Sequence, residues 1–170
     1  FKGRIFSFLK KPDNIHDNGS YILLEKGAIV CDETGVIVEI DDYSKLAKKY
    51  EGIETEDFGS KIICPGFIDL HNHFPQTQVI ASYWTKLLEW LNKYTFPNES
   101  LFSDDSHCER ESKVFLDLLN NNGITTTVSF GSVHVNSVEY LFREAHNRNM
   151  CVIAGNVLMD RNAPDKVLEK

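Results

Sequence analysis

The feature that most constrains the fold of this chain is the alternation of strand-like and helix-like segments that begins after Gly66. Strand-like runs are dense in β-branched residues, and helix-like runs repeat apolar residues every three or four positions. In chain order they are a strand at 67–71, helices at 84–94 and 107–120, a strand at 124–130, a helix at 137–147 and a strand at 150–154. Strands that are joined through helices pair in parallel. The sequence therefore predicts an α/β region with three parallel strands.

The residues before Gly66 follow a different pattern, in which short apolar runs alternate with turns. Asp32–Gly35 is a turn between two β-branched runs, as in a β-hairpin. Ser44 is the expected N-cap of a short helix, and Pro65-Gly66 stops the last strand. We therefore predict two parts, a β segment at 1–65 and an α/β segment at 66–170.

Composition excludes several classes of protein. The chain has 170 residues, of which 42% are hydrophobic and 25% charged, so it is globular rather than disordered. Its net charge of −7, without a cluster of Lys or Arg, argues against binding to nucleic acid or to an anionic membrane. The four cysteines form no Cys-x-x-Cys pair and fit reduced thiols. We therefore expect a cytoplasmic protein with neither kind of partner.

The two ends of the chain suggest a longer protein. The chain begins with Phe1 rather than Met and ends at Lys170 without a stop signal, so we expect that both ends are cut. Three parallel strands cannot close an eight-stranded barrel. If the α/β segment belongs to such a barrel, this chain contains only its beginning.

Two histidines at the end of the first predicted parallel strand are candidate metal ligands. His71 and His73 lie two residues apart, and alternation along a strand places both on one face, together with Asp69. Imidazole is the commonest protein ligand for divalent first-row metals. The alternative is a pair of surface or hydrogen-bonded histidines, because a full site needs three or four ligands. The position after Pro65-Gly66, at the mouth of a parallel sheet, favours the metal site.

The residues around this pair resemble a known family. The run Pro65-Gly66-Phe67-Ile68-Asp69-Leu70-His71-Asn72-His73 resembles the Pro-Gly-hydrophobic-hydrophobic-Asp-x-His-x-His signature of the amidohydrolase superfamily. From about residue 60 to the end, the chain is similar to the guanine deaminases, above all the bacterial ones. Four blocks carry this similarity, of which the second is the most specific: residues 73–77, 87–97, 122–127 and 159–164.

The resemblance implies a fold and an activity. The fold would be the beginning of a metal-dependent (β/α)8 barrel, preceded at 1–65 by part of a small β-sandwich. The activity would be hydrolysis of guanine to xanthine and ammonia by a zinc-activated water, in a protein that forms a homodimer when full length. His71 and His73 would be two ligands of one Zn²⁺ per subunit, although imidazole sites also accept iron. His73 and Gln76 would contact guanine, and a Gln has both the donor and the acceptor that an amide edge requires.

The resemblance also implies that part of the site lies elsewhere. The remaining His and Asp ligands and the Glu that shuttles the proton belong to later strands in the family, so we expect them beyond Lys170. We therefore expect the 170-residue chain alone to be inactive. Asn156 departs from the pattern of the guanine deaminases, which often carry Lys after the same glycine.

Three further features have a structural and a functional interpretation. His107-Cys108-Glu109 matches the His-x-Glu of cytidine-deaminase zinc sites, but no Pro-Cys-x-x-Cys follows, so we interpret it as a solvated helix start. His134 follows a predicted strand and is a candidate pocket-lining residue, although a lone loop histidine is more often structural. Trp90 is a second candidate for the pocket, but it lies in an apolar stripe with Leu87, Leu88 and Leu91 that more often forms core.

Two alternatives to a guanine deaminase remain open at this point. The first is another amidohydrolase that acts on a heterocyclic C–N or C–Cl bond. The second is a catalytically incomplete fragment that lacks the downstream ligands. The block around Trp90 and the position of Gln76 argue against the first.

Overall fold

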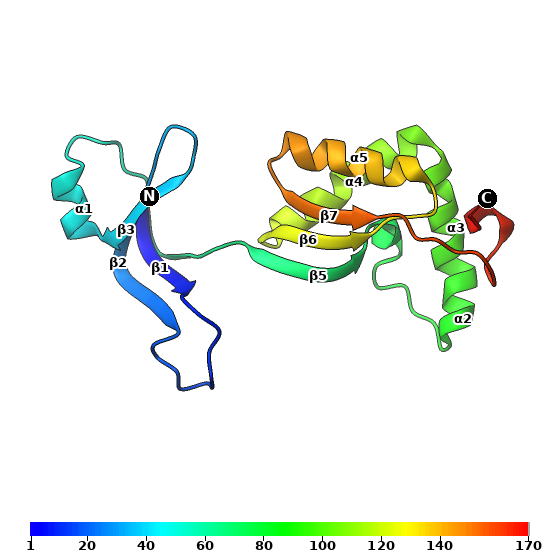
Figure 1. The fold of residues 1–170 in the computed structure, drawn as a ribbon, viewed down its shortest axis with the longest axis horizontal. Coiled ribbons are helices and arrows are strands. Elements are labelled where there is room, and N and C mark those ends of the chain that lie inside the picture. Colours follow the sequence, from blue (N-terminus) through cyan, green and yellow to red (C-terminus); the bar gives the residue numbers. More distant parts are fainter. Residues whose placement is uncertain (170) are drawn as a thin grey trace. The chain divides into compact units, whose positions relative to one another are not determined.

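The computed structural model describes residues 1–169 and divides the chain into two compact units (Figure 1). Unit 1 is Phe1–Pro65 and unit 2 is Gly66–Lys170, with Lys170, the last residue of the predicted second part, outside the described residues. Within residues 1–169, no helix combines the length and the apolar character needed to cross a bilayer.

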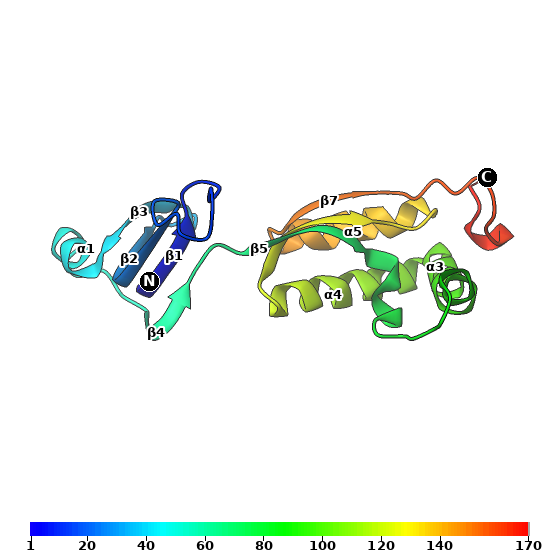
Figure 2. The same ribbon diagram turned by 90° about the horizontal axis from the view of Figure 1, so that it is seen from below.

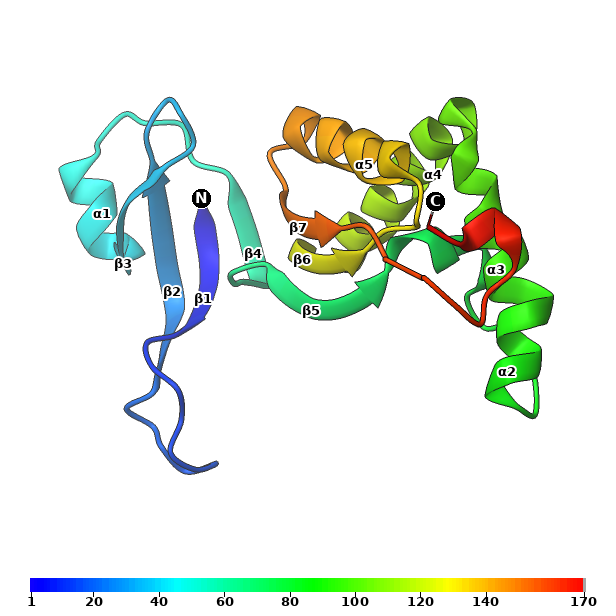
Figure 3. The same cartoon turned by 45° about the vertical axis from the view of Figure 1, so that its right-hand side comes forward.

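Unit 1 is a four-stranded sheet with one short helix (Figure 3). The order across the sheet is β3-β2-β1-β4, in which β1 and β2 and then β2 and β3 pair antiparallel, whereas β4 runs parallel to β1. Its buried apolar residues are Ile5, Ala28 and Leu46. The elements are β1 Lys2–Phe8, β2 Tyr21–Cys31, β3 Ile37–Asp42, α1 Tyr43–Lys49 and β4 Asp57–Ile63.

The predicted hairpin and helix of unit 1 are present, with one correction. The turn between β2 and β3 has Gly35 at a φ of 84°, a conformation that glycine adopts without strain. The N-cap of α1 is Asp42 and not Ser44, because the Asp42 carboxylate accepts a hydrogen bond from the Ser44 main-chain nitrogen at 2.9 Å. A carboxylate also suits the positive end of the helix dipole.

Unit 2 is an α/β unit with three parallel strands in the order β5-β6-β7, which confirms the predicted α/β class and parallel pairing. Two long helices alternate with these strands, and short helical segments follow β5. The strands are β5 Phe67–His73, β6 Ile124–Phe130 and β7 Cys151–Gly155, and the long helices are α4 Asp105–Asn121 and α5 Val135–Asn147. The short segments are η1 Phe74–Val79, α2 Leu87–Trp90, η2 Leu91–Thr95, α3 Phe96–Glu99, η3 Ser100–Ser103 and η4 Asp165–Val167.

The core of unit 2 lies between the helices and the sheet. Helices α4 and α5 cover the same face of the sheet (Figure 2). Burying a large apolar side chain contributes roughly 1.5–3 kcal/mol, so the cluster of buried side chains in this core stabilises unit 2. It is made of Phe74, Phe102, Cys108, Phe115, Leu116, Leu119, Leu141 and Ala145.

The entry into β5 depends on Gly66. A Cβ atom at this position would lie 2.0 Å from the Thr125 hydroxyl oxygen, which no side chain tolerates. The next main-chain nitrogen, of Phe67, donates to the Gly123 carbonyl oxygen at 2.7 Å. Pro65-Gly66 therefore does more than end a strand, since its glycine lets β5 approach β6 closely.

The single helix predicted at 84–94 is in fact a series of short segments. Here α2 passes into the π-helix η2, which ends just before α3 and its Pro97. Proline lacks an amide N–H and its ring collides with the preceding turn, so regular α-helical pairing cannot continue through it. Leu87 and Leu88, interpreted as core, are 69% and 72% exposed, so that interpretation was wrong for these two residues.

Candidate metal and substrate site

The carboxyl end of β5 holds the two candidate metal ligands close together. The ring centroids of His71 and His73 lie 5.5 Å apart, with the ring planes at 78°. In the sheet, His73 is the register partner of Phe130, the last residue of β6. The Phe130 ring stacks on His73 at 4.9 Å and meets His71 edge-on at 5.5 Å. Phe130 therefore packs against both imidazoles, a role that the sequence pattern did not indicate.

The chemistry of the pair fits a metal that prefers imidazole. No described residue forms a hydrogen bond with either imidazole ring, so the ring nitrogens have no competing partner in residues 1–169. Burial, and then the neighbouring His71, lower the pKa of His73 and favour the neutral form that binds metals. Across the same residues, no group of three or more His, Cys, Asp or Glu side chains is placed to hold a metal. The pair therefore fits as two donors of a larger set.

A network of buried and half-buried polar side chains lies beside the pair. The Asn72 amide nitrogen donates to the Asp69 carboxylate at 2.9 Å and to the Thr127 hydroxyl at 2.6 Å, and the Ser129 hydroxyl donates to the Asn72 amide oxygen at 2.6 Å. Thr127 and Ser129 are buried, whereas Asp69 and Asn72 are half-buried, so the two hydroxyls depend on Asn72 as their partner on β5. The network connects the end of β5 to β6 through hydrogen bonds, and it therefore holds the main chain at His71 in position.

The alternation expected along β5 is interrupted in this network. Between Asp69 and Asn72, β5 advances three residues while its partner β6 advances two, from Thr127 to Ser129, which is a β-bulge. Asp69, predicted on the face of the histidines, accepts from the Asn72 side chain and from the His71 main-chain nitrogen at 3.1 Å. The Asn72 bond is the main cause of the lowered pKa of Asp69.

His73, Gln76 and Trp90 line one cavity. Its volume is about 420 Å³, within the range of small-molecule sites. The Trp90 indole nitrogen donates to the Ser82 hydroxyl at 2.8 Å, so its polar edge is occupied by the chain itself. The other lining residues are Asp69, Asn72, Thr77, Val79, Ile80, Ala81, Ser82, Phe115, Leu118 and Leu119. The structure therefore brings these three predicted site residues together.

Gln76 has a buried partner that the sequence analysis missed. Its amide nitrogen donates to the Glu99 carboxylate at 3.1 Å, and Glu99 is only 5% exposed. Burial raises the pKa of Glu99, and the bond from Gln76 lowers it. A lone Glu is usually exposed, so its residue type gave no reason to expect burial at Glu99. The only sequence signal was its position just after the block at 87–97.

His134 lies in a different cavity, which the structure does not join to the one beside His73. This cavity of about 960 Å³ is also lined by Asn156. The Nε2 atom of His134 is buried and has no partner among residues 1–169, and burial lowers the pKa of the ring. The Asn156 amide donates to the carbonyl oxygens of Ser132 and His134, at 2.9 Å each. Asn156 therefore joins the end of β7 to the loop after β6.

The interpretation of His107-Cys108-Glu109 as a solvated helix start was wrong for two of its residues. His107 is 6% exposed and Cys108 is fully buried. The His107 ring packs edge-on against Phe102 at 4.7 Å, and its Nδ1 atom lies 2.8 Å from the Arg110 guanidinium. These contacts make His107 a part of the helix packing.

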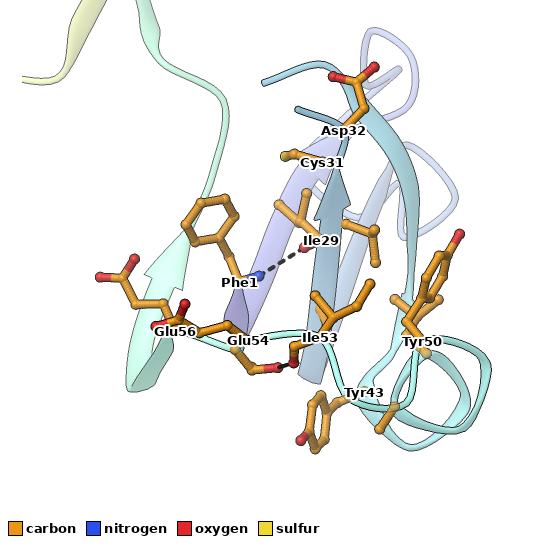
Figure 4. A pocket seen from close by; sticks show the side chains of 14 residues that line it. Phe1, Ile29, Cys31, Asp32, Tyr43, Tyr50, Ile53, Glu54 and Glu56 are labelled. Atoms are coloured by element: carbon orange, nitrogen blue, oxygen red, sulfur yellow. Dashed lines mark hydrogen bonds between the residues drawn. The ribbon is translucent and has the colours of Figure 1, made fainter. Parts of the chain in front are cut away.

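A further cavity, of about 380 Å³, lies within unit 1 (Figure 4). The Phe1 main-chain nitrogen donates to the Ile29 carbonyl oxygen at 2.9 Å at its wall, and Tyr43, Tyr50 and Ile53 line it with apolar surface. It contains no histidine and none of the predicted site residues.

Comparison with known proteins places this geometry in context. The chain is 47% identical over 117 residues to guanine deaminase from Escherichia coli, a match that covers 69% of this chain and 27% of that protein. The crystal structure of guanine deaminase from Bradyrhizobium japonicum superposes with a TM-score of 0.93 at 37% identity, covering 99% of this chain and 37% of that one. A second structure, guanine deaminase from C. acetobutylicum with guanine bound in its active site, gives a TM-score of 0.84 at 31% identity. It covers 100% of this chain and 38% of that one.

These matches confirm the resemblance to guanine deaminases that the sequence predicts. The chain spans about a quarter to two fifths of the length of these relatives. The model of the Amidohydrolase family matches residues 62–170, which include β5, β6 and β7. This chain therefore belongs to the amidohydrolase family.

Proposed function

We propose that this chain forms the front part of a guanine deaminase, an enzyme that hydrolyses guanine to xanthine and ammonia. The observation that carries the proposal is the placement of His73 beside both His71 and the cavity of Gln76. His73 would then both bind the metal that activates the nucleophile and contact the purine. The similarity to guanine deaminases, one of them with bound guanine, supports this substrate.

His71 and His73 would provide two ligands of a single Zn²⁺. When bound, zinc lowers the pKa of a coordinated water to about 7 and so supplies the nucleophile of a hydrolysis at neutral pH. Iron is the alternative for imidazole ligands. The resemblance implies that a His, an Asp and a proton-shuttling Glu complete the site, and we propose that these residues lie beyond Lys170.

The chain's own residues would bind and orient the purine. Gln76 would bond the amide edge of guanine, while Trp90 and Phe115 provide apolar walls of the same cavity. The cavity of about 420 Å³ is large enough for a purine base. His134 and its cavity have no part in this proposal.

We further propose that β5, β6 and β7 are the first three strands of a (β/α)8 barrel and that unit 1 is part of a β-sandwich. The apolar side chains of Ile68, Leu70 and Ile153 in these strands are exposed, as expected for a sheet that continues into a closed barrel. Exposed Val38 and Ile40 on β3 support a second layer over the sheet of unit 1. The cytoplasmic location and the homodimer stay predictions.

A metal analysis and a substrate panel on the full-length protein test this proposal. We expect about one zinc per subunit and conversion of guanine to xanthine, with ammonia released in equal amount. Turnover of another amino- or chloro-substituted heterocycle but not of guanine would favour the alternative amidohydrolase. Guanine turnover by the 170-residue chain alone would overturn the placement of the missing ligands.

A further inference from the structure

The buried contact between Gln76 and Glu99 has a consequence for substrate choice. We propose that Glu99 is a positioning residue that fixes which end of the Gln76 amide faces the cavity, and thereby selects the purine edge that the site accepts. The inference rests on the proposed function in one respect, namely that Gln76 contacts the purine. The geometry of the contact itself is independent of that function.

Both sides of the contact are held in place. The residue before Glu99, Asn98, is also buried, and its amide donates to the carbonyl oxygen of Pro75, the residue before Gln76. Two consecutive residues at the end of α3 therefore bind two consecutive residues of η1. Phe74 and Pro75 are themselves buried, which anchors η1 in the core. The position of Glu99 relative to Gln76 is thus set by packing and not by one exposed bond.

The chemistry of the two groups determines the orientation. The two ends of a Gln amide have nearly the same shape, but one accepts a hydrogen bond and the other donates. An ionised carboxylate only accepts, and Glu99 faces the amide nitrogen of Gln76 at 3.1 Å. Burial raises the pKa of Glu99, and the bond from Gln76 opposes this shift and favours the ionised form. A flipped Gln76 amide would place its oxygen against the Glu99 carboxylate oxygen, so that two acceptors would face each other. Glu99 is buried, and Gln76 is its only side-chain hydrogen-bond partner among residues 1–169.

The orientation of Gln76 decides which purine edge fits. With one N–H directed to Glu99, the amide oxygen and the second N–H remain for the ligand in a fixed order. The amide edge of guanine presents a carbonyl acceptor and an N–H donor. In 2,6-diaminopurine, which keeps the same 2-amino group, that edge presents an amino donor and a ring-nitrogen acceptor, so the order is reversed. A fixed Gln76 therefore accepts one of these bases and rejects the other.

The test is the ratio of kcat/KM for 2-amino hydrolysis of guanine to that of 2,6-diaminopurine, measured with the full-length enzyme. Glu99→Gln keeps the size of the side chain, but the new amide can both donate and accept a hydrogen bond. The amide of Gln76 can then adopt either orientation. We expect the ratio to fall about tenfold, the effect of one charge-assisted hydrogen bond. Glu109→Gln, on the exposed face of α4, is the matched control and should leave the ratio unchanged. A uniform loss for both bases, or an unchanged ratio, would overturn the inference, because a purely structural role affects both substrates equally.

A second measurement keeps the inference testable if Glu99→Gln does not fold or if the protein does not act on guanine. The side-chain amide protons of Gln76, assigned by their loss in Gln76→Met, are followed by NMR in the wild-type protein. We expect them to exchange with solvent more slowly than those of Gln78, which is exposed two residues further on. Equal exchange would reject the Glu99 contact, whereas protection together with an absence of purine turnover would reject only the proposed function.

Discussion

The two units of this chain differ in where their polar side chains contact one another. Both units pair charged side chains at the surface, as in Lys2–Asp57 and Lys49–Glu39 of unit 1 and Lys113–Glu109 of unit 2. Unit 2 in addition joins buried polar side chains near the end of β5, in the Asn72 network and in the Gln76–Glu99 contact. The cavity lined by His73 and Gln76 is bordered by such groups, whereas the cavity of about 380 Å³ in unit 1 is not.

The difference indicates where geometry matters for function. Surface ion pairs contribute little, because water and salt screen them and the side chains lose freedom. Buried polar groups are costly unless every partner is satisfied, and when satisfied they hold a structure rigidly. The Asn72 network lies next to His71 and His73 on β5, and Glu99 contacts Gln76. The proposed function needs His71, His73 and Gln76 in fixed positions. We therefore expect changes in unit 2 to have large effects and changes to the ion pairs of unit 1 to have small ones.

The largest effect is expected from His71→Ala in the full-length protein. Loss of one imidazole should reduce zinc affinity by more than the roughly 10–100-fold that loss of an outer-shell partner costs, and guanine turnover should fall with it. Metal content after dialysis, measured together with activity, checks this. The matched control is His146→Ala, on the exposed side of α5, which should retain both. Full zinc content in His71→Ala would break the ligand assignment.

The second effect concerns the core that supports the site. Leu116→Ala removes a fully buried side chain from the cluster of α4 and α5, and we expect it to destabilise unit 2 by roughly 2–5 kcal/mol. Chemical unfolding followed by circular dichroism measures the change. Leu87→Ala is the control, because Leu87 is exposed and should have little effect. Equal losses in the two variants would mean that Leu87 is covered in the protein in solution.

The contrast between Leu116 and Leu87 also shows what the sequence could predict. Three parallel strands followed from the alternation of strand-like and helix-like runs, and β6 has the predicted bounds 124–130. Helical spacing predicts that apolar residues share a face, but it does not say whether anything covers that face. The stripe at Leu87 and Leu88 was therefore interpreted as core, although both residues are exposed.

The site was predictable in its types of residue and not in its supporting contacts. The candidate ligands His71 and His73 and the candidate purine contact Gln76 are recognisable from local spacing and resemblance. The β-bulge before Asn72 is not, because alternation assumes that paired strands advance in step. Glu99 and Phe130 reach the site from other elements, across 23 residues to Gln76 in the first case, and no local pattern records such a contact.

A third and smaller effect is expected from Asn72→Ala. The change leaves the buried hydroxyls of Thr127 and Ser129 without their partner on β5, which typically costs about 1–3 kcal/mol. Because Asn72 also holds the end of β5, zinc affinity should weaken, although less than in His71→Ala. Unfolding and zinc titration measure the two effects. Asn147→Ala, at an exposed position of α5, is the control. An equal loss of stability in that variant would contradict the claim that the Asn72 network stabilises unit 2 more than an exposed Asn does.

The smallest effect is expected from Lys49→Ala in unit 1. The hydrogen bond from Lys49, and to a lesser extent that from Tyr50, lowers the pKa of Glu39 below its usual 4.5. The Lys49–Glu39 pair therefore stabilises the fold fully above pH 4.5 and loses its effect as the pH falls through the lowered pKa. Because the pair is at the surface, we expect a barely measurable drop in Tm at neutral pH, which shrinks further as the pH falls through the lowered pKa of Glu39. Added salt should erase the difference at neutral pH. A drop in Tm as large as that of Asn72→Ala would contradict the contrast between the units, since it would make a surface pair as important as the buried network beside His71.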